Sequence, residues 1–438
     1  MFKKAVFIVA LILFAPTAFA IDKNELNTEF FNKFNDKYLV QYINEAIENN
    51  HNAKQATARV EEYRQQVKTS LSKELPYFGV SADYLGVNFP KVDNFSVSKN
   101  AFVLPFFVNY EADLLLKNRD KTKSTKKSYE MSQFEEKSAY LALLSDVATV
   151  YTNILQYDEL IKQQQNIVEN YSKILKSDNK KFVRGIINTT DLNNSESNLS
   201  SSNIILENFI KQREVLLMQL AVLTGQNADC FENLQRGSFN DFEYNAVIPS
   251  EIDSDVIFSR PDVKRAEAAL KKAKIDIRVA RKEFLPKFNI TGIWAFNNIA
   301  QGSFFSWESS LAALLAGTTQ DIFTGGRKIA NLKYQKAKYQ ELFENYKQTD
   351  LEAVKEVNTS LCLIKHDTNA ENITKEKLLL EAKNFNNTEK MLNRGVISKN
   401  QYLNSENLYI NKNMDLTRAK TQRLVNYYTL YKAVGGKI

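Results

Sequence analysis

The chain has 438 residues, and both glycine (13) and proline (7) are scarce in it. Because these two residues interrupt helices and strands, their scarcity predicts long unbroken elements. The formal net charge of +7 is mild. Lysines alternate with glutamates instead of clustering, which argues against a nucleic-acid-binding protein.

Residues 1–20 have the pattern of a secretory signal peptide. Lys3 and Lys4 precede a short apolar run over residues 5–14, and residues 18–20 have the small-x-small form that signal peptidase cleaves. We therefore expect the mature chain to begin at Ile21. No later apolar run is long enough for a transmembrane helix. This pattern favours a secreted protein, a periplasmic protein or an outer-membrane β-barrel.

The first half begins with helix-forming sequence. Over residues 37–74 the apolar side chains follow i, i+3, i+4 spacing, which predicts a helix that ends before Pro76. Residues 77–89 and 102–113 instead alternate apolar and polar side chains. This alternation predicts a two-stranded hairpin with one aromatic-rich face.

A very long helix is expected next, because residues 117–182 contain no glycine or proline. At 1.5 Å per residue it would be roughly 100 Å long. Gly185 should end it, and Thr189 or Thr190 should cap a further helix that runs to about residue 224. A polar, irregular stretch over residues 226–257 then links the two halves.

The second half repeats this order. Pro261 is expected at the start of a helix that ends before Pro286. Alternation predicts a second strand hairpin over residues 287–323, whose second strand, at about 307–322, is continuously apolar in its middle. A glycine-free helix should cover residues 328–394, Gly395 should turn it, and the last helix should end at Gly435-Gly436.

Landmarks in the two halves keep a constant separation of 210 positions. Pro76 corresponds to Pro286, and Gly185 to Gly395. Glu111 and Lys117 correspond to Asp321 and Arg327, and the triplet Asn194-Ser195-Glu196 corresponds to Asn404-Ser405-Glu406. Register kept over more than a hundred residues indicates that one large unit was duplicated and that its length matters.

These observations divide the chain into four parts. They are a signal peptide (1–20), a first repeat (21–225) with a strand hairpin at 77–113 and a helical tip at 185, an inter-repeat segment (226–257), and a second repeat (258–438) with a strand hairpin at 287–323 and a tip at 395. In each repeat two short helices placed end to end match one long helix. Both strand hairpins should therefore lie at one end and both glycine turns at the other.

The strands constrain the number of copies. A small closed barrel needs about eight strands, and four strands per chain leave open edges that a membrane does not tolerate. Copies of the chain must therefore share one barrel, and three copies supply twelve strands. The expected fold is mainly α, with duplicated helical hairpins that form a trimeric periplasmic α-barrel below a twelve-stranded outer-membrane β-barrel.

Five short motifs support this interpretation. They are Ser259-Arg260-Pro261-Asp262 with Ala266-Glu267, Ala280-Arg281 with Leu285-Pro286, residues 321–327 (Asp-Ile-Phe-Thr-Gly-Gly-Arg), residues 394–398 (Arg-Gly-Val-Ile-Ser) and residues 431–436 (Tyr-Lys-Ala-Val-Gly-Gly). In this order, on a duplicated chain, they resemble the TolC family of outer-membrane efflux proteins over nearly the full mature length. The resemblance implies a homotrimer that docks to a periplasmic adaptor (membrane fusion protein) and an inner-membrane pump of RND, MFS or ABC type.

The resemblance also implies functional residues at the helical tips. The adaptor is expected to contact Arg184, Gly185, Ile186, Arg394, Gly395 and Val396. Family members carry acidic side chains just past these turns, at the tunnel entrance. Asp191 occupies that place in the first copy, where a helix dipole also favours an acid. Gln401 and Asn404 occupy it in the second copy, a departure that weakens a cation-binding ring.

Aromatic side chains in the strand regions are candidates for lipid contact or for the interfacial belts of a membrane barrel. They are Phe102, Phe106, Tyr110, Phe288, Trp294, Phe296 and Trp307. The alternative, core packing in a soluble sheet, would need a second apolar layer that the sequence does not supply.

The predicted function is a passive outer-membrane exit duct for efflux or type I secretion, spanning the outer membrane and extending into the periplasm. The alternatives are a structural coiled-coil surface protein and a periplasmic adaptor without channel activity. We expect no enzyme, no cofactor and no metal site, because His51 and His366 lack ligand-type neighbours. Cys230 and Cys362 are expected to be separate buried thiols, with a single disulfide as the open alternative.

Overall fold

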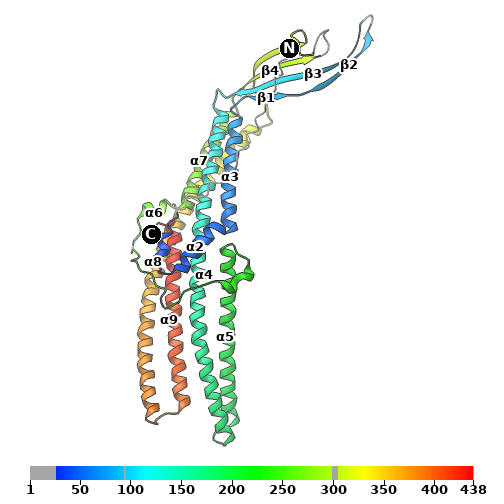
Figure 1. The fold of residues 1–438 in the computed structure, drawn as a ribbon. Helices are drawn as coiled ribbons and strands as arrows, with labels where there is room; N and C mark the ends of the chain where they lie inside the picture. Colours follow the sequence, from blue (N-terminus) through cyan, green and yellow to red (C-terminus); the bar gives the residue numbers. More distant parts are fainter. Residues whose placement is uncertain (1–25, 93–94, 250, 298–303, 438) are drawn as a thin grey trace.

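The structure is a computed structural model that describes residues 26–92, 95–249, 251–297 and 304–437. The predicted signal peptide lies outside the described residues. The molecule is elongated, with a β-sheet at one end, two helical hairpin tips at the other and a thicker waist between them (Figure 1). None of the described helices combines the length and the apolar composition needed to cross a membrane.

The first half contains five helices and three strands within the described residues. They are α1 (Glu29–Asn32), α2 (Lys37–Asn49), α3 (His51–Ser72), β1 (Tyr77–Val80), β2 (Asp83–Val92), β3 (Phe95–Ala112), α4 (Lys117–Val183) and α5 (Thr189–Leu223). The prediction of a single helix over residues 37–74 is wrong, because the helix is interrupted at Asn50, between α2 and α3. Asn50 has an extended backbone, and its side chain caps α3 by accepting from the Ala53 N–H at 3.0 Å.

The second half repeats the order of the larger elements. It contains a 3₁₀ helix η2 (Ala228–Asn233), α6 (Ser254–Phe258), α7 (Pro261–Lys282), β4 (Lys287–Asn297), β5 (Ser310–Thr319), α8 (Arg327–Asn393) and α9 (Lys399–Ala433). Helix lengths match across the halves: α4 and α8 have 67 residues each, α5 and α9 have 35, and α3 and α7 have 22. The segment over 226–257 is more ordered than expected, because it includes η2 and α6.

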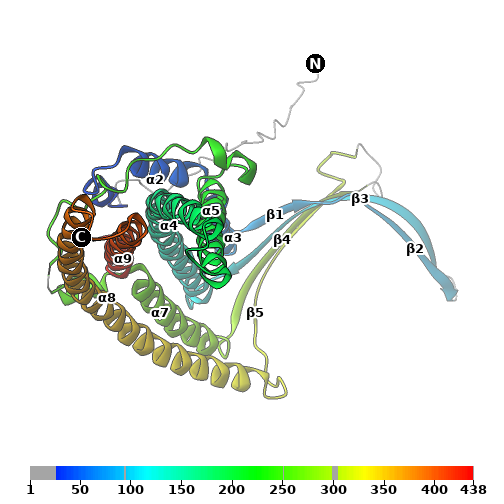
Figure 2. The ribbon, with the colours of Figure 1, turned by 90° about the horizontal axis from the view of Figure 1, so that it is seen from below.

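The long helices lie side by side with the shorter ones in a curved layer (Figure 2). Helix α4 packs against α3 near the sheet and against α5 near the tips. In the same way α8 packs against α7 and then α9, and α4 also packs against α7 and α9. Across the layer the order is therefore α3 or α5, then α4, then α7 or α9, then α8. The outer sides of α3, α5 and α8 form the two edges of the layer.

The sheet has the same order as the helices. Strand β4 pairs with β3 on one side and with β5 on the other, and both pairings are antiparallel. On its other side, β3 pairs with β1 along one stretch and with β2 along the next. Strands β1 and β2 are therefore two parts of one interrupted edge strand, and the sheet is four strands wide. The second strand of the second hairpin is shorter than predicted, and Trp307, 80% exposed, precedes it in a turn.

The two faces of the sheet differ in polarity, as the alternation predicted. Phe106 pairs with Trp294, with ring centroids 6.3 Å apart, and both side chains are more than 40% exposed. On the other face, Thr291 donates a hydrogen bond to the side chain of Asn109 at 3.2 Å. No helix covers the aromatic face in either view (Figures 1 and 2). Within the described part of the chain, the aromatic face is therefore uncovered.

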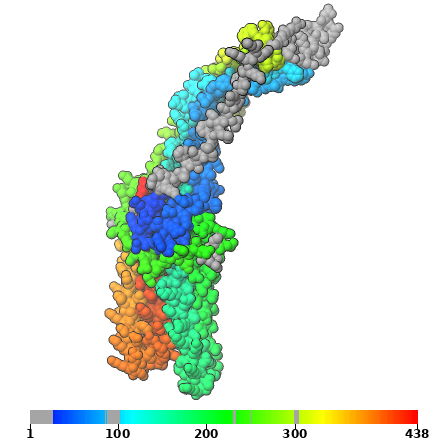
Figure 3. All heavy atoms as spheres, in the orientation of Figure 1, coloured from blue at the N-terminus to red at the C-terminus, as the bar shows by residue number. Residues whose placement is uncertain are grey.

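The main hydrophobic cluster joins the N-terminal helices to the long ones. In Figure 3 these N-terminal helices, in dark blue, cover the waist on the face shown. Phe30 stacks on Tyr431 with ring centroids 4.7 Å apart, and Phe34 contacts Phe242 and Tyr428. These side chains are at most 1% exposed. Large aromatic side chains each bury about 150–250 Å². This hydrophobic cluster therefore stabilises the middle of an otherwise narrow molecule.

Cys362 is exposed, and its thiol is free. The expectation of a buried thiol is therefore wrong at this position. The buried side chains of this part of α8 include Ser360 and Ile364. Two residues along a helix correspond to a rotation of about 200°, so Cys362 lies on the opposite side of α8. The side chain of Cys230 lies outside the described residues.

Arg260 joins three helices below the sheet. Its guanidinium donates to Asp262 at the start of α7 (2.7 and 3.0 Å), to Glu356 on α8 (2.6 Å) and to the carbonyl oxygen of Ala433 at the end of α9 (2.7 Å). The side chain is only 7% exposed. Loss of a partner from such a buried network leaves polar groups without compensation.

Replacing Arg260 by alanine should therefore destabilise the helical body by about 3 kcal/mol. The expected result is a lower thermal unfolding midpoint, followed by circular dichroism at 222 nm. Arg59→Ala is the matched control, because Arg59 pairs with Glu135 at the surface (3.3 Å, about half exposed). Such exposed pairs contribute less than about 1 kcal/mol. Equal effects of the two substitutions would contradict this role for Arg260.

Candidate docking tips and tunnel entrance

The two helical tips have the same backbone geometry. After α4, the N–H of Gly185 donates to Phe182 O and the N–H of Ile186 to Lys181 O, both at 2.9 Å; after α8, Gly395 and Val396 donate to Leu392 O and Met391 O at the same distances. This is the Schellman arrangement that ends a helix. Gly185 and Gly395 both have φ of +71°, which favours glycine for steric reasons.

The tips present exposed side chains. Arg184 and Arg394 are exposed, and the two apolar residues that follow the glycines, Ile186 and Val396, are 65% and 64% exposed. A Cβ added at either glycine would meet nothing within 4 Å. The glycines are therefore required by the backbone conformation of the turn and not by close packing. Each tip offers a basic residue, a bare backbone turn and one apolar side chain.

The predicted entrance residues lie just past the tips, with Asp191 and Gln401 in the first turns of α5 and α9 and Asn404 in the second turn of α9. Asp191, Gln401 and Asn404 are all exposed. The cap of α5 is Asn188, whose side chain accepts from the Asp191 N–H at 2.8 Å, so the prediction of a threonine cap is wrong. Asparagine is among the strongest N-cap residues, which is the signal that could have identified it.

Gln401 has a structural role at the start of α9. Its side chain accepts from the Ser398 N–H at 2.8 Å, while the Ser398 hydroxyl accepts from the Gln401 N–H at 3.2 Å. This reciprocal pair is a capping box. The side-chain oxygen of Gln401 is therefore engaged in capping its own helix. Among the three predicted entrance residues, Asp191 is the acidic one.

Asp178, which the sequence analysis missed, links the two hairpins near their tips. It lies on α4 and accepts hydrogen bonds from Lys181 Nζ (2.8 Å), Ser195 Oγ on α5 (2.7 Å) and Asn400 Nδ2 on α9 (2.7 Å). Burial alone would raise the pKa of this carboxyl group, but the hydrogen bonds from Lys181 and Ser195 outweigh it and lower the pKa below its usual 3.8.

A second link lies further from the tips. Asn170 on α4 donates to Asn407 Oδ1 (2.9 Å) and Glu406 Oε2 (3.2 Å) on α9. Ser195 and Glu406 belong to the triplets that recur in the two halves of the sequence: Ser195 contacts α4 within the first hairpin, and Glu406 contacts α4 from the second hairpin. Nothing in the sequence pattern singled out Asp178, because its partners come from three different helices.

The aromatic candidates lie at the far end of the molecule from the tips (Figure 1). Phe102, Phe106, Trp294 and Trp307 are exposed, while Tyr110, Phe288 and Phe296 are half-buried. All of them except Trp307 belong to strands β3 and β4. The structure therefore groups six of the seven on one small sheet and separates them from the tip residues.

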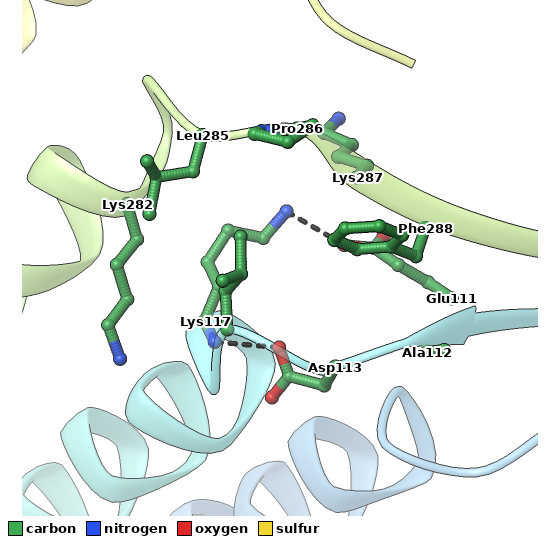
Figure 4. A pocket seen from close by; sticks show the side chains of 10 residues that line it. Glu111, Ala112, Asp113, Lys117, Lys282, Leu285, Pro286, Lys287 and Phe288 are labelled. Carbon is green, nitrogen blue, oxygen red and sulfur yellow. Dashed lines mark hydrogen bonds and ion pairs between the residues drawn. The ribbon is translucent and has the colours of Figure 1, made fainter. Parts of the chain in front are cut away.

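A small pocket lies where the strands meet the helices (Figure 4). Lys117 Nζ pairs with Glu111 at 2.8 Å inside it. Asp113 accepts from the N–H groups of Lys117, Asn118 and Arg119 at 2.6–3.0 Å, which caps α4. These contacts join the end of β3 to the start of α4. Among the described residues there is no cluster of three or more His, Cys, Asp or Glu side chains that could hold a metal ion.

Replacing Asp178 by alanine should loosen the contact between the hairpins, because Ser195 and Asn400 lose their shared acceptor. We expect backbone amides at residues 396–403 to exchange hydrogen for deuterium about tenfold faster, which corresponds to about 1.4 kcal/mol. Mass spectrometry of the purified protein measures this. Asp191→Ala, at an exposed carboxylate nearby, is the control, and equal exchange in both variants would contradict the link.

The same link should depend on pH. A carboxyl group with a lowered pKa in the folded protein stabilises the fold above its unfolded pKa, and this contribution disappears as the pH falls through the folded pKa. Exchange at residues 396–403, corrected for its intrinsic pH dependence, should therefore be constant from pH 7 to about pH 5 and rise below about pH 4. Asp178→Asn should remove this rise; a rise that persists in this variant would assign it to another group.

Comparison with known proteins agrees with this geometry. The family model described as "Outer membrane efflux protein" matches residues 42–226 and 254–436. The chain is 23% identical to the probable outer membrane lipoprotein SilC of Salmonella typhimurium, over 96% of this chain and 92% of that protein. It is 24% identical to the cation efflux system protein CusC of Escherichia coli strain K12, over 96% and 93% of the two chains.

Solved structures share the fold. The Campylobacter jejuni CmeC outer membrane channel superposes with a TM-score of 0.87 at 22% identity, covering 94% of this chain and 88% of that one. The open state of the Neisseria gonorrhoeae MtrE outer membrane channel gives a TM-score of 0.80 at 22% identity, covering 92% and 89%. The family match extends over most of both halves of the sequence. The chain therefore belongs to the outer membrane efflux protein family.

Proposed function

We propose that this chain is the outer-membrane exit duct of a tripartite efflux or type I secretion system. In this role it is a passive conduit that receives substrate from an inner-membrane pump through a periplasmic adaptor. The observation that carries the proposal is the continuity of the fold. A sheet with an exposed aromatic face runs strand by strand into a curved layer of helices, which ends at two exposed turns.

Ring closure by three copies is supported by the two open edges of this layer. One edge carries β5 and α8, with exposed Leu351 (67%) and Leu380 (60%); the other carries β1, β2, α3 and α5, with exposed Ile204 (62%) and Val222 (57%). An interface that joins one edge of a subunit to the opposite edge of the next closes into a ring. Three copies then give a twelve-stranded β-barrel and a continuous α-barrel.

The same proposal assigns a role to the duplication. Repeats at residues 21–225 and 258–438, joined by the segment at 226–257, each contribute half of a subunit's wall. Matched lengths of α4 and α8, and of α5 and α9, support this division. Equal helices bring both tips close to the same level, which suits docking to a partner that approaches along the axis.

The tips are proposed to dock the adaptor through Arg184, Gly185, Ile186, Arg394, Gly395 and Val396. Asp191, Gln401 and Asn404 would line the entrance, where three-fold symmetry turns each Asp191 into a ring of three carboxylates that favours cations. Phe102, Phe106, Tyr110, Phe288, Trp294 and Phe296 would contact lipid or form the aromatic belts, with Trp307 at the outer rim.

The alternatives fit less well. A surface coiled coil has no reason to carry a sheet with an exposed apolar face, and a periplasmic adaptor does not account for a family match over both halves of the chain. Relatives are named for the export of different compounds, including cations and toluene. The identity of the substrate therefore does not follow from these likenesses.

Assembly tests the duct directly. Purified from outer membranes, the protein should migrate as a trimer on an unheated gel and as a 50 kDa chain or slightly smaller after boiling. The trimer should carry current across a planar lipid bilayer, since its lumen is water-filled. Current carried by single chains, or a monomeric product in the soluble fraction, would overturn the proposal.

Docking is tested by placing charge on the apolar residues of both tips. The double variant Ile186→Asp/Val396→Asp should lower tolerance of exported compounds to the level of a deletion strain, since two buried charges at an interface cost several kcal/mol. Growth inhibition by antibiotics, detergents and metal salts measures this. Val247→Asp, on a 91% exposed residue at the waist, should retain full tolerance. Full export by the double variant, with normal trimers, would contradict docking at the tips.

A further inference from the structure

Two apolar side chains stand out at the junction between β5 and α8. Ile322 is 98% exposed and Phe323 is 88% exposed. Both lie in the short segment between Thr319, the last residue of β5, and Arg327, the first of α8. Exposure of adjacent large apolar side chains to this extent costs free energy in water, about 1.5–3 kcal/mol for each side chain that could otherwise be buried.

The backbone presents these side chains in a fixed position. Asp321 pairs with Lys328 at 3.1 Å, Gln320 donates to the carbonyl oxygen of Phe284 at 2.8 Å, and the Arg327 N–H donates to Thr324 O at 3.1 Å. Before the exposed pair, the segment is therefore tied to the residues that follow α7 and to Lys328 on α8; after the pair, a turn leads into α8.

The matching junction in the first half is built differently. At the constant separation of 210 positions, Phe323 replaces Asp113, the carboxylate that caps three N–H groups of α4. The N-cap of α8 is instead Gly326, and no side chain caps this helix. A cap of this kind contributes about 1 kcal/mol, so the second half has an exposed aromatic ring in place of a stabilising contact.

The location of the pair indicates what covers it. Strands β4 and β5 have 11 and 10 residues, close to the 9–11 residues that cross a bilayer as a tilted strand. Thr319 pairs with Lys287 at the end of the sheet nearest the helices. Ile322 and Phe323 follow within four residues of this end, which is the level of the membrane–water boundary if the sheet crosses the bilayer.

The one acidic residue between Thr319 and Arg327 is Asp321, which is paired with Lys328. Lys287 and Arg327 are exposed at this junction. Lysine and arginine at this depth complement the phosphates of anionic lipids, while apolar and aromatic side chains enter the boundary between headgroups and acyl chains. Cations around an apolar pair match the chemistry of a phospholipid surface.

We propose that Ile322 and Phe323 insert into the periplasm-facing phospholipid leaflet of the outer membrane, with Lys287 and Arg327 at the level of the lipid phosphates. The pair then fixes the depth of the barrel by anchoring the start of the longest helix of the second half at the membrane surface. This inference rests on the proposed function, because it requires the sheet to cross the membrane.

Depth-dependent fluorescence quenching tests the inference. Phe323→Trp is made in the background Trp294→Phe/Trp307→Phe, which removes both native tryptophans, and the trimer is reconstituted into vesicles of phosphatidylethanolamine and phosphatidylglycerol. Lipids brominated near the headgroup end of the acyl chain should reduce the emission at least twofold. Val247→Trp, at the exposed waist, is the aqueous control and should not be quenched.

A second position separates failure of the inference from failure of the proposed function. Leu314 lies on β5, on the same face as Trp294, and is 76% exposed. Leu314→Trp should be quenched if the sheet crosses the membrane. Quenching at position 314 but not at 323 would overturn the inference and indicate burial against a second copy of the chain. Absence of quenching at both positions would overturn the membrane sheet as well.

A spin label gives an independent measurement if the tryptophan variant fails to form trimers. Ile322→Cys, in the background Cys230→Ser/Cys362→Ser, is labelled with a nitroxide. Membrane-dissolved oxygen should relax the label more strongly than a water-soluble nickel complex does. The reverse order would overturn the inference.

Discussion

The fold depends on the two edges of a sheet that is only four strands wide. Every backbone N–H and C=O group needs a partner when it leaves water, and in lipid an unpaired edge is prohibitively costly. Within the described residues, the outer strands of this sheet, β5 and the interrupted strand β1–β2, are each paired on one side only. Each strand continues into a helix of the layer below, so the same two edges extend along the helical body. A partner that satisfies the sheet also covers the helices.

The waist holds this extended layer in shape. Phe30, Phe34 and Tyr431 pack into a cluster that joins the N-terminal helices to α4 and α9, and Arg260 joins α7, α8 and α9 just above it. Below the waist each hairpin is narrow, and a smaller cluster of Leu160, Ile167, Ile410 and Met414 joins α4 to α9 together with polar contacts. Asp178 and Asn170 each bridge from α4 to α9. Directional hydrogen bonds of this kind can be broken individually.

The two halves of the chain have helices of equal length, but the side chains at corresponding positions differ. Helices α4 and α8 have the same number of residues and end in the same turn with the same dihedral angle at glycine. Their N-termini differ, since Asp113 caps one while Phe323 stands exposed beside the other. Their surroundings differ as well: α4 lies inside the layer and buries many of its side chains, whereas α8 lies at an edge and buries few among the described residues. The two halves thus provide the same scaffold with different outward surfaces.

Local signals predicted most of the fold, because helix length, helix ends and strand alternation are properties of neighbouring residues. The glycine-free run over 117–182 predicted α4 to within one residue, and Gly185 and Gly395 marked the turns, since a left-handed backbone position favours glycine. Local signals failed where neighbouring residues were equally plausible helix caps, since the cap of α5 is Asn188 and not Thr189 or Thr190. They also failed at Asn50, which interrupts an apolar pattern typical of a single helix. The constant separation of 210 positions and the family motifs indicated the family, which the match over both halves confirmed.

By itself, the sequence determined the long helices, the glycine turns that end them, the repeat at a constant separation and the two-faced polarity of the strands. The tertiary structure alone decided which helices lie at the edges of the layer, that Cys362 is exposed, and that Asp178 joins Ser195 and Asn400 across three helices. It also decided that Ile322 and Phe323 have no cover within the described part of the chain. The physical reason is the sequence distance over which each effect acts. Propensity and periodicity act over a few residues, whereas burial and hydrogen bonding depend on groups that are hundreds of residues apart until the chain folds.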